Sequence, residues 1–239
     1  MSFLALAVVA AATFVTSFIS GILGMAGGMI LMGILIALLP VATAMLLHGI
    51  TQFAANGWRT WMLRGSVRWR VFRGYAIGSI AAFVFFGMVQ IVASKPMALI
   101  MLGAMPFLAL MLPSKWHLNV ERRWHSEACG AVCMALALVA GVSGPVLDVF
   151  FIRSKMGRHA VVASKASTQS LTHLLKIVYF GEMLASGNAG DGALDRRGHD
   201  RSRLHRHHAL EARARENRRL GVSQLDALDD DERGRGVPG

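Results

Sequence analysis

Long apolar runs joined by short polar connections make up most of the chain as far as about residue 186. A helix rises 1.5 Å per residue, so these runs are long enough to cross all or half of a bilayer core of about 30 Å. Because helices satisfy every backbone polar group internally, the pattern predicts an all-α polytopic membrane protein. The expected helices are Phe3–Ser20, Met29–Leu39, Val41–Gly57, Tyr75–Ala93, Pro96–Leu112, Ser126–Ala140, Val146–Ile152 and His159–Phe180.

A polar stripe runs along the expected helix His159–Phe180. Lys165, Gln169 and His173 follow one another at steps of four and share one face, and Lys176 lies one turn further on. Polar and ionisable groups are costly inside a membrane and usually line a pathway or a pocket. The alternative is that they only bond neighbouring helices. A buried Lys165 needs Asp148, carbonyl oxygens or the substrate as its partner.

The first half of the chain repeats this arrangement. A shift of 117 residues places His48, Gln52 and Asn56 on the polar stripe just described. Such matching halves are the usual sequence signature of a transporter binding site. The two stripes are therefore expected to converge near the bilayer midplane. A shift of 120 residues also aligns the glycines before the two short runs, Gly21 with Gly141 and Gly24 with Gly144.

Both short apolar runs follow glycine-rich breaks. Met29–Leu39 and Val146–Ile152 are too short to cross a bilayer, which predicts half-helices. The unpaired amides at the start of such a helix favour an anion. Close packing by small residues is the alternative. The glycines expected at these starts are Gly24, Gly27, Gly28 and Gly144.

Composition supports a membrane protein and removes the nucleic-acid interpretation of the charge. The 239 residues have a mean hydropathy of +0.47 and are 54% hydrophobic, too apolar for a soluble domain of this size. The net charge of +11 comes mainly from three joints, 58–73, 114–125 and 153–158. Basic joints between membrane helices mark the cytoplasmic side. Placing all three inside makes the two halves inverted repeats.

The composition changes near residue 187. The segment 187–239 is rich in Arg and Asp and contains no Phe, Trp, Tyr, Ile or Met. Two helices of the second repeat are expected here and are missing. This amino-acid composition is typical of a gene translated in a shifted reading frame, and a disordered tail is the alternative. The predicted organisation is a first repeat at 1–113, an incomplete second repeat at 114–186 and a polar tail at 187–239.

Several motifs together resemble the sulfite exporter TauE/SafE family of membrane permeases. They are the glycine-rich segment Gly21–Gly28, the segment Gly141–Pro145 with Asp148, and the segment Ala163–Gln169. The resemblance covers roughly residues 3–181. It implies a multi-pass protein of the bacterial inner membrane that moves sulfite, sulfonates or related organosulfur anions.

The expected function is secondary transport of a small anion across the lipid bilayer, without a cofactor. The anion would be bound by Gly24, Gly27, Gly28, His48, Gln52, Asn56, Gly144, Asp148, Lys165, Gln169 and His173. A coupling proton would be carried by His48, Asp148 or His173.

Two other functions remain open from the residues alone. One is an accessory subunit that does not transport, and the other is a membrane enzyme using His173, Lys165 and Asp148. No nucleophile or metal signature favours the enzyme. Cys129 and Cys133 lie one turn apart, and His125 lies a further turn back, but no fourth ligand is nearby. The two cysteines are therefore expected to be buried small residues and not a metal site.

Overall fold

The computed structural model describes residues 11, 14–16, 26–111 and 118–186, and these residues form helices and short connections without a strand. The all-α prediction is confirmed for this part of the chain. The predicted first helix lies mostly outside the described residues, and Gly24 and the segment 187–239 lie wholly outside them. The elements are α2 (Ala26–Leu38), α3 (Val41–Met62), the 3-10 turn η1 (Arg64–Ser66), α4 (Trp69–Val89), α5 (Lys95–Met111), α6 (His125–Val139), α7 (Gly144–Phe151) and α8 (Arg158–Ala185).

The connection between the third and fourth helices is shorter than predicted. Gly57 does not end α3, which continues through Arg59 to Met62. Nothing lies within 4 Å of the position where a Cβ on Gly57 would sit, so close packing does not require a glycine here. The helix continues through this residue. The expected basic joint 58–73 is therefore mostly helical, and Arg59 belongs to the bundle.

The two short helices have the predicted character but start earlier than expected. α2 has 13 residues and α7 has 8, so neither reaches across a bilayer. Gly27 and Gly28 lie in the first turn of α2, where a break was expected. Gly144 is the first residue of α7, and Pro145 fits in that first turn because its missing N–H has no helical partner there.

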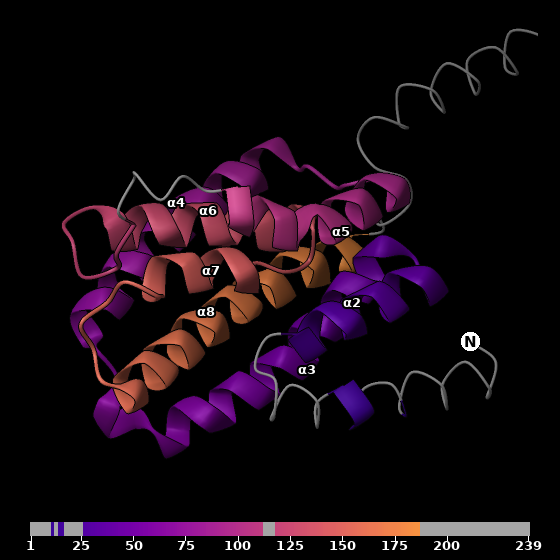
Figure 1. Cartoon of the computed structure of the whole chain (residues 1–239). Helices are drawn as coiled ribbons and strands as arrows, with labels where there is room; N and C mark the ends of the chain where they lie inside the picture. Colours follow the sequence, from indigo (N-terminus) through magenta and orange to yellow (C-terminus); the bar gives the residue numbers. More distant parts are fainter. Residues whose placement is uncertain (1–10, 12–13, 17–25, 112–117, 187–239) are drawn as a thin grey trace, which may run out of the picture. The chain divides into compact units, whose positions relative to one another are not determined.

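α3 and α8 pack against each other along most of their lengths, and Figure 1 shows them side by side. They run antiparallel, because Leu46 of α3 contacts Gly181 near the end of α8, while Thr60 lies 3.4 Å from Ser170 (Oγ1 to Oγ) further towards its start. Two equivalent helices of inverted repeats would also run antiparallel. The inverted repeat itself stays a prediction.

A second close pair, α4 and α6, is built on glycines. A Cβ on Gly78 would collide with the carbonyl of Glu127, and one on Gly130 would collide with the carbonyl of Tyr75. The two backbones therefore touch, as small residues allow in membrane helices. Ser79 adds a hydrogen bond, since its hydroxyl donates to the Gly130 carbonyl at 3.2 Å. This pair forms the scaffold behind the polar helices.

One described helix, α4, is long and apolar enough to cross a membrane by composition alone. Its outer face is exposed and apolar, which suits contact with lipid. α5 has 17 residues, as many as the predicted helix Pro96–Leu112, with Pro106 inside it. α3 and α8 are longer, with 22 and 28 residues. They carry the polar stripes, so their hydropathy is too low for them to be identified as membrane spans by composition.

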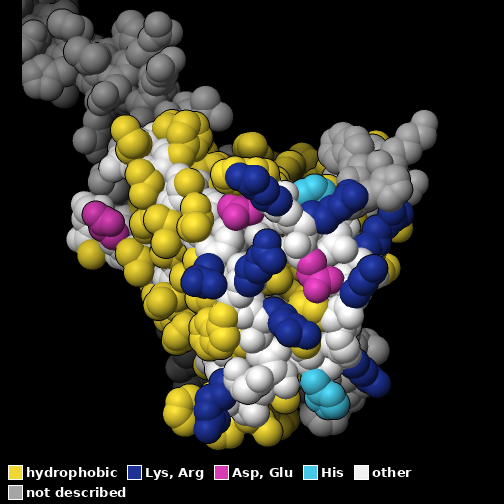
Figure 2. Space-filling view, turned by 90° about the vertical axis from the view of Figure 1, so that its left-hand side faces the viewer, with side chains coloured by type: hydrophobic (Ala, Val, Ile, Leu, Met, Phe, Trp, Pro, Cys, Tyr) yellow, Lys and Arg dark blue, Asp and Glu magenta, His cyan; other side chains and the backbone are white. Residues whose placement is uncertain are grey.

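The three basic joints meet at one end of the bundle. The amide of Arg68 donates to Ser164 of α8 at 2.9 Å, and the side chain of Asn119 donates to the Arg153 carbonyl at 2.9 Å. Figure 2 looks onto this end and shows Lys and Arg side chains gathered on it. Their clustering is what a cytoplasmic face requires. We refer to this as the basic end.

Candidate functional site

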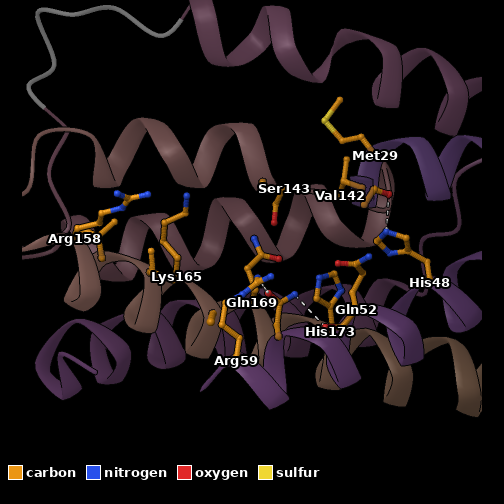
Figure 3. Close-up of a pocket in the computed structure, with 16 residues that line it drawn as sticks. Met29, His48, Gln52, Arg59, Val142, Ser143, Arg158, Lys165, Gln169 and His173 are labelled. Atoms are coloured by element: carbon orange, nitrogen blue, oxygen red, sulfur yellow. Dashed lines mark hydrogen bonds between the residues drawn. The ribbon is translucent and has the colours of Figure 1, made fainter. Parts of the chain in front are cut away.

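A cavity of about 320 Å³ lies between α2, α3, α8 and the turn before α7 (Figure 3). Its size is that of a small-molecule site. Most of the polar side chains in its wall come from the two predicted stripes. The lining residues are Gly28, Met29, His48, Gln52, Asn56, Arg59, Val142, Ser143, Gly144, Arg158, Val161, Val162, Lys165, Ala166, Gln169 and His173.

The structure brings together most of the residues singled out from the sequence. Gly27 is buried beside the cavity without lining it, and Gly24 lies outside the described residues. Asp148 does not line the cavity either, but forms an ion pair with Lys165 at its edge. The predicted residues in the wall are Gly28, His48, Gln52, Asn56, Gly144, Lys165, Gln169 and His173.

The inner end of the cavity holds three buried polar atoms that have no hydrogen-bond partner among the described residues. They are the Ser143 hydroxyl, Nε2 of Gln169 and Nδ1 of His173. Each of these side chains is at most 5% exposed. Figure 3 shows Ser143 and Gln169 on facing sides of the cavity. A buried polar group without a partner costs about 1–3 kcal/mol, so three in one cavity indicate a place for a polar ligand.

Two helix starts border the same space. Gly28 in the first turn of α2 and Gly144 at the start of α7 both line the cavity. The first amides of a helix have no partner within it and carry partial positive charge. Ser143 precedes α7 without capping it, so its hydroxyl remains free for another acceptor. The arrangement can hold an anion through backbone and side-chain donors together.

The mouth of the cavity lies towards the basic end and carries cations. Arg158 is exposed at the first residue of α8, and Lys165 is 24% exposed beside Asp148. Arg59 is half-buried and donates to Oδ1 of Asn56 at 3.2 Å. Exposure falls from this mouth to His48, which is 1% exposed at the far side. An anion entering from the basic end therefore meets positive charge first.

Three of these lining residues were missed in the sequence. Arg59 and Arg158 were assigned to the basic joints, and Ser143 was passed over between two glycines. A signal existed for Arg59, because the shift of 117 residues that aligns the two stripes also places Arg59 on Lys176, and Arg59 stands three residues after Asn56. No comparable signal marked Ser143, whose role depends on how the turn before α7 folds.

Lys176 lies behind the cavity and not in its wall. Its side chain is 0% exposed, and its Nζ donates to the Gly141 carbonyl at 2.8 Å. It also lies 3.2 Å from Nδ1 of His48. His48 in turn donates from Nε2 to the Gly28 carbonyl at 2.9 Å. A chain of contacts thus joins α8, α3 and α2 at the closed end.

A helical bundle with half-helices, a lipid-suited outer face and a polar cavity lined by cations has the features of a membrane permease. The described residues contain no group of three or more metal-ligating side chains. The sequence matches the family model of the sulfite exporter TauE/SafE over residues 9–192, so the chain belongs to this family. No curated protein and no solved structure gives a significant match. The resemblance drawn from the glycine and polar motifs is confirmed, and the protein is an integral membrane transporter for a small anion, not an enzyme.

Proposed function

We propose that this chain is a multi-pass secondary transporter of the bacterial inner membrane that carries sulfite, sulfonates or related organosulfur anions. The anion binds in the cavity between α3, α8 and the turn before α7. The observation that carries the proposal is the set of three unpartnered buried polar atoms, on Ser143, Gln169 and His173. An oxyanion with several acceptor oxygens would satisfy donors from opposite walls at once.

The charge of the wall favours a small anion over a neutral solute. Arg59, Arg158 and Lys165 approach or line the mouth, and Asp148 neutralises only one of these three cations. Guanidinium groups also match the geometry of oxyanions and stay charged at all relevant pH values. A sulfite or sulfonate group is small enough for a cavity of about 320 Å³.

The cavity is open towards the basic end and closed at His48. If the basic joints face the cytoplasm, this is an inward-facing arrangement. Transport then requires the closed end to open while the basic end closes, as in other carriers built from two repeats. The antiparallel α3–α8 pair contributes most of the polar wall, and a change in its packing would expose the site to the other side.

Reconstitution into liposomes tests this function. Wild-type protein should move labelled sulfite into or out of the liposomes. Lys165→Met should lower anion affinity by about thirtyfold, equivalent to roughly 2 kcal/mol, because it removes a charge from the mouth. The fold should survive, since Lys165 and its partner Asp148 are both partly exposed.

Leu174→Val is the matched control, because Leu174 is on α8 but is 42% exposed and does not line the cavity. It should transport as the wild type does. Sulfite binding without movement would favour the accessory-subunit role. Absence of both binding and movement, in protein that is folded, would refute the proposed function.

A further inference from the structure

The closed end of the cavity contains a fully buried lysine without a carboxylate partner among the described residues. The ion pair recorded in that part of the chain joins Lys165 to Asp148, at the other end of the cavity. Lys176 has instead three neutral acceptors, namely the Gly141 carbonyl at 2.8 Å, Nδ1 of His48 at 3.2 Å and Sδ of Met32 at 3.9 Å. Burying an ammonium with neutral partners alone is costly, and such a lysine rarely serves packing only.

The hydrogen bonds of His48 and Lys176 show which of their nitrogen atoms carry hydrogens. The Gly28 carbonyl can only accept, so Nε2 of His48 carries a hydrogen. In a neutral imidazole Nδ1 is then an acceptor, and Lys176 donates to it. A neutral amine at Lys176 can serve the two strong acceptors and turn its lone pair towards Met32. An ammonium gives all three acceptors a hydrogen, so the same cage holds either form.

The turn that supplies the carbonyl is shaped for this contact. Gly141 has φ of +81°, a conformation that L side chains rarely adopt. A Cβ there would lie 2.7 Å from Sδ of Met32, so a side chain could be added only if the buried side chain of Met32 shifted. The close approach of Met32, Gly141 and Lys176 therefore joins α2, the α6–α7 turn and α8 at one point.

We propose that Lys176 and His48 form a proton-binding site at the closed end of the cavity, which takes up one proton when an anion binds. This inference rests on the proposed function. In the step, a proton leaves water or a buffer acid and forms a new N–H bond with the lone pair of Lys176 Nζ, without oxidation or reduction. His48 lines the cavity and contacts Lys176 directly, so an anion in the cavity stabilises the new positive charge.

Other titratable groups near this point have different surroundings. His173, on α8, is the closest alternative, with its ring centroid 5.5 Å from that of His48 and its Nδ1 without a hydrogen-bond partner among the described residues. Tyr75 of α4 is held by Thr172 at 2.7 Å. α2 and the turn before α7 contribute no titratable side chain in the described residues around Lys176. The remaining charged or titratable groups on the packed elements are Arg59, Arg70, Arg73, His125, Glu127, Cys129, Cys133, Asp148, Arg158, His159, Lys165, Tyr179 and Glu182.

Calorimetric titration of the detergent-purified full chain tests the proposal. The probe is methanesulfonate, whose own charge does not change over the range of the assay. Binding heats are compared in buffers with different ionisation enthalpies, which gives the number of protons taken up. Wild-type protein should take up a fraction of a proton, up to one, per anion. Its affinity should fall with rising pH by at most about tenfold per pH unit.

Lys176→Met should abolish the uptake and flatten the pH dependence. His173→Gln should weaken binding but retain the uptake, and Leu174→Val should behave as wild type. Uptake that persists in Lys176→Met would overturn the proposal, and uptake lost in His173→Gln alone would move the site to His173.

The wild-type measurement alone tests the proton site, even if the Lys176→Met variant does not fold. Measurable binding with no proton uptake would refute the proton site and leave the proposed function standing. Absence of binding heat with both methanesulfonate and sulfite would instead refute the proposed function itself.

Discussion

Replacing Gln169 by leucine should weaken anion binding without lowering the stability of the protein. Nε2 of Gln169 is buried at the inner end of the cavity and has no hydrogen-bond partner among the described residues. A hydrogen bond to an anion contributes about 1.5–3 kcal/mol. Gln169→Leu should therefore weaken sulfite or methanesulfonate binding by about 10- to 150-fold.

The same change should leave the stability of the empty protein unchanged or raise it. Gln169 is 5% exposed, and leucine has a similar volume without a polar group to bury. Removing an unsatisfied buried donor recovers up to about 1–3 kcal/mol. The expected result is thus weaker binding together with an equal or higher melting temperature, a combination that a packing contact would not give.

Thr172→Val is the matched control for this prediction. Thr172 is on the same helix and equally buried, but its hydroxyl bonds Tyr75 and not the cavity. Valine keeps the shape and removes the hydrogen bond between Thr172 and the buried Tyr75 hydroxyl, so stability should fall by about 1–3 kcal/mol while binding stays the same. Calorimetric titration and thermal unfolding in detergent give both quantities. If Gln169→Leu lowers stability and leaves binding intact, Gln169 is a packing residue and the reasoning is wrong.

Three further predictions concern the scaffold, the mouth and the topology. Gly130→Ala should destabilise the α4–α6 pair by about 1–3 kcal/mol through overpacking, whereas Gly103→Ala, with open space around it, should be neutral or slightly stabilising; thermal unfolding measures both. Asp148→Asn frees the cation that it neutralises and should tighten anion binding about two- to fivefold in a titration, while weaker binding would make Asp148 a direct ligand. In a cysteine-free background of intact cells, an impermeant thiol reagent should label Ser94→Cys and spare Ser66→Cys at the basic end, and the reverse pattern would invert the topology.

The part of the site that follows from helical periodicity was predictable from the sequence. Steps of four along one helix put Lys165, Gln169 and His173 on one face, and these three side chains line one wall of the cavity. The same periodicity in the first half gave the facing wall. Because both stripes lie on single long helices, no knowledge of the tertiary structure was needed to group them.

Features that depend on contacts between elements were not predictable. Arg59 was missed as a cavity residue because the helix was predicted to end at Gly57. The space around Gly57 is open, so this glycine is not required by close packing and the helix continues past it. The sequence predicted that Lys176 extends the polar stripe of Lys165, Gln169 and His173. Lys176 follows His173 by three residues and not four, so it lies at the edge of the face that these residues share. What covers this edge is Gly141, and its position is set by a turn with a positive φ that sequence spacing does not reveal.

The polar stripes explain why the site and the fold depend on each other. α3 and α8 are long enough to span a bilayer, but their polar side chains make them poor membrane spans on hydropathy. Buried polar groups in a membrane need partners, and the two helices supply some of them to each other, as Thr60 and Ser170 do. Five buried side-chain atoms have no hydrogen-bond partner among the described residues, and three of them line the cavity, on Ser143, Gln169 and His173. An anion bound there completes the set of hydrogen bonds that the α3–α8 pair leaves open, so binding should stabilise the bundle as well as occupy it.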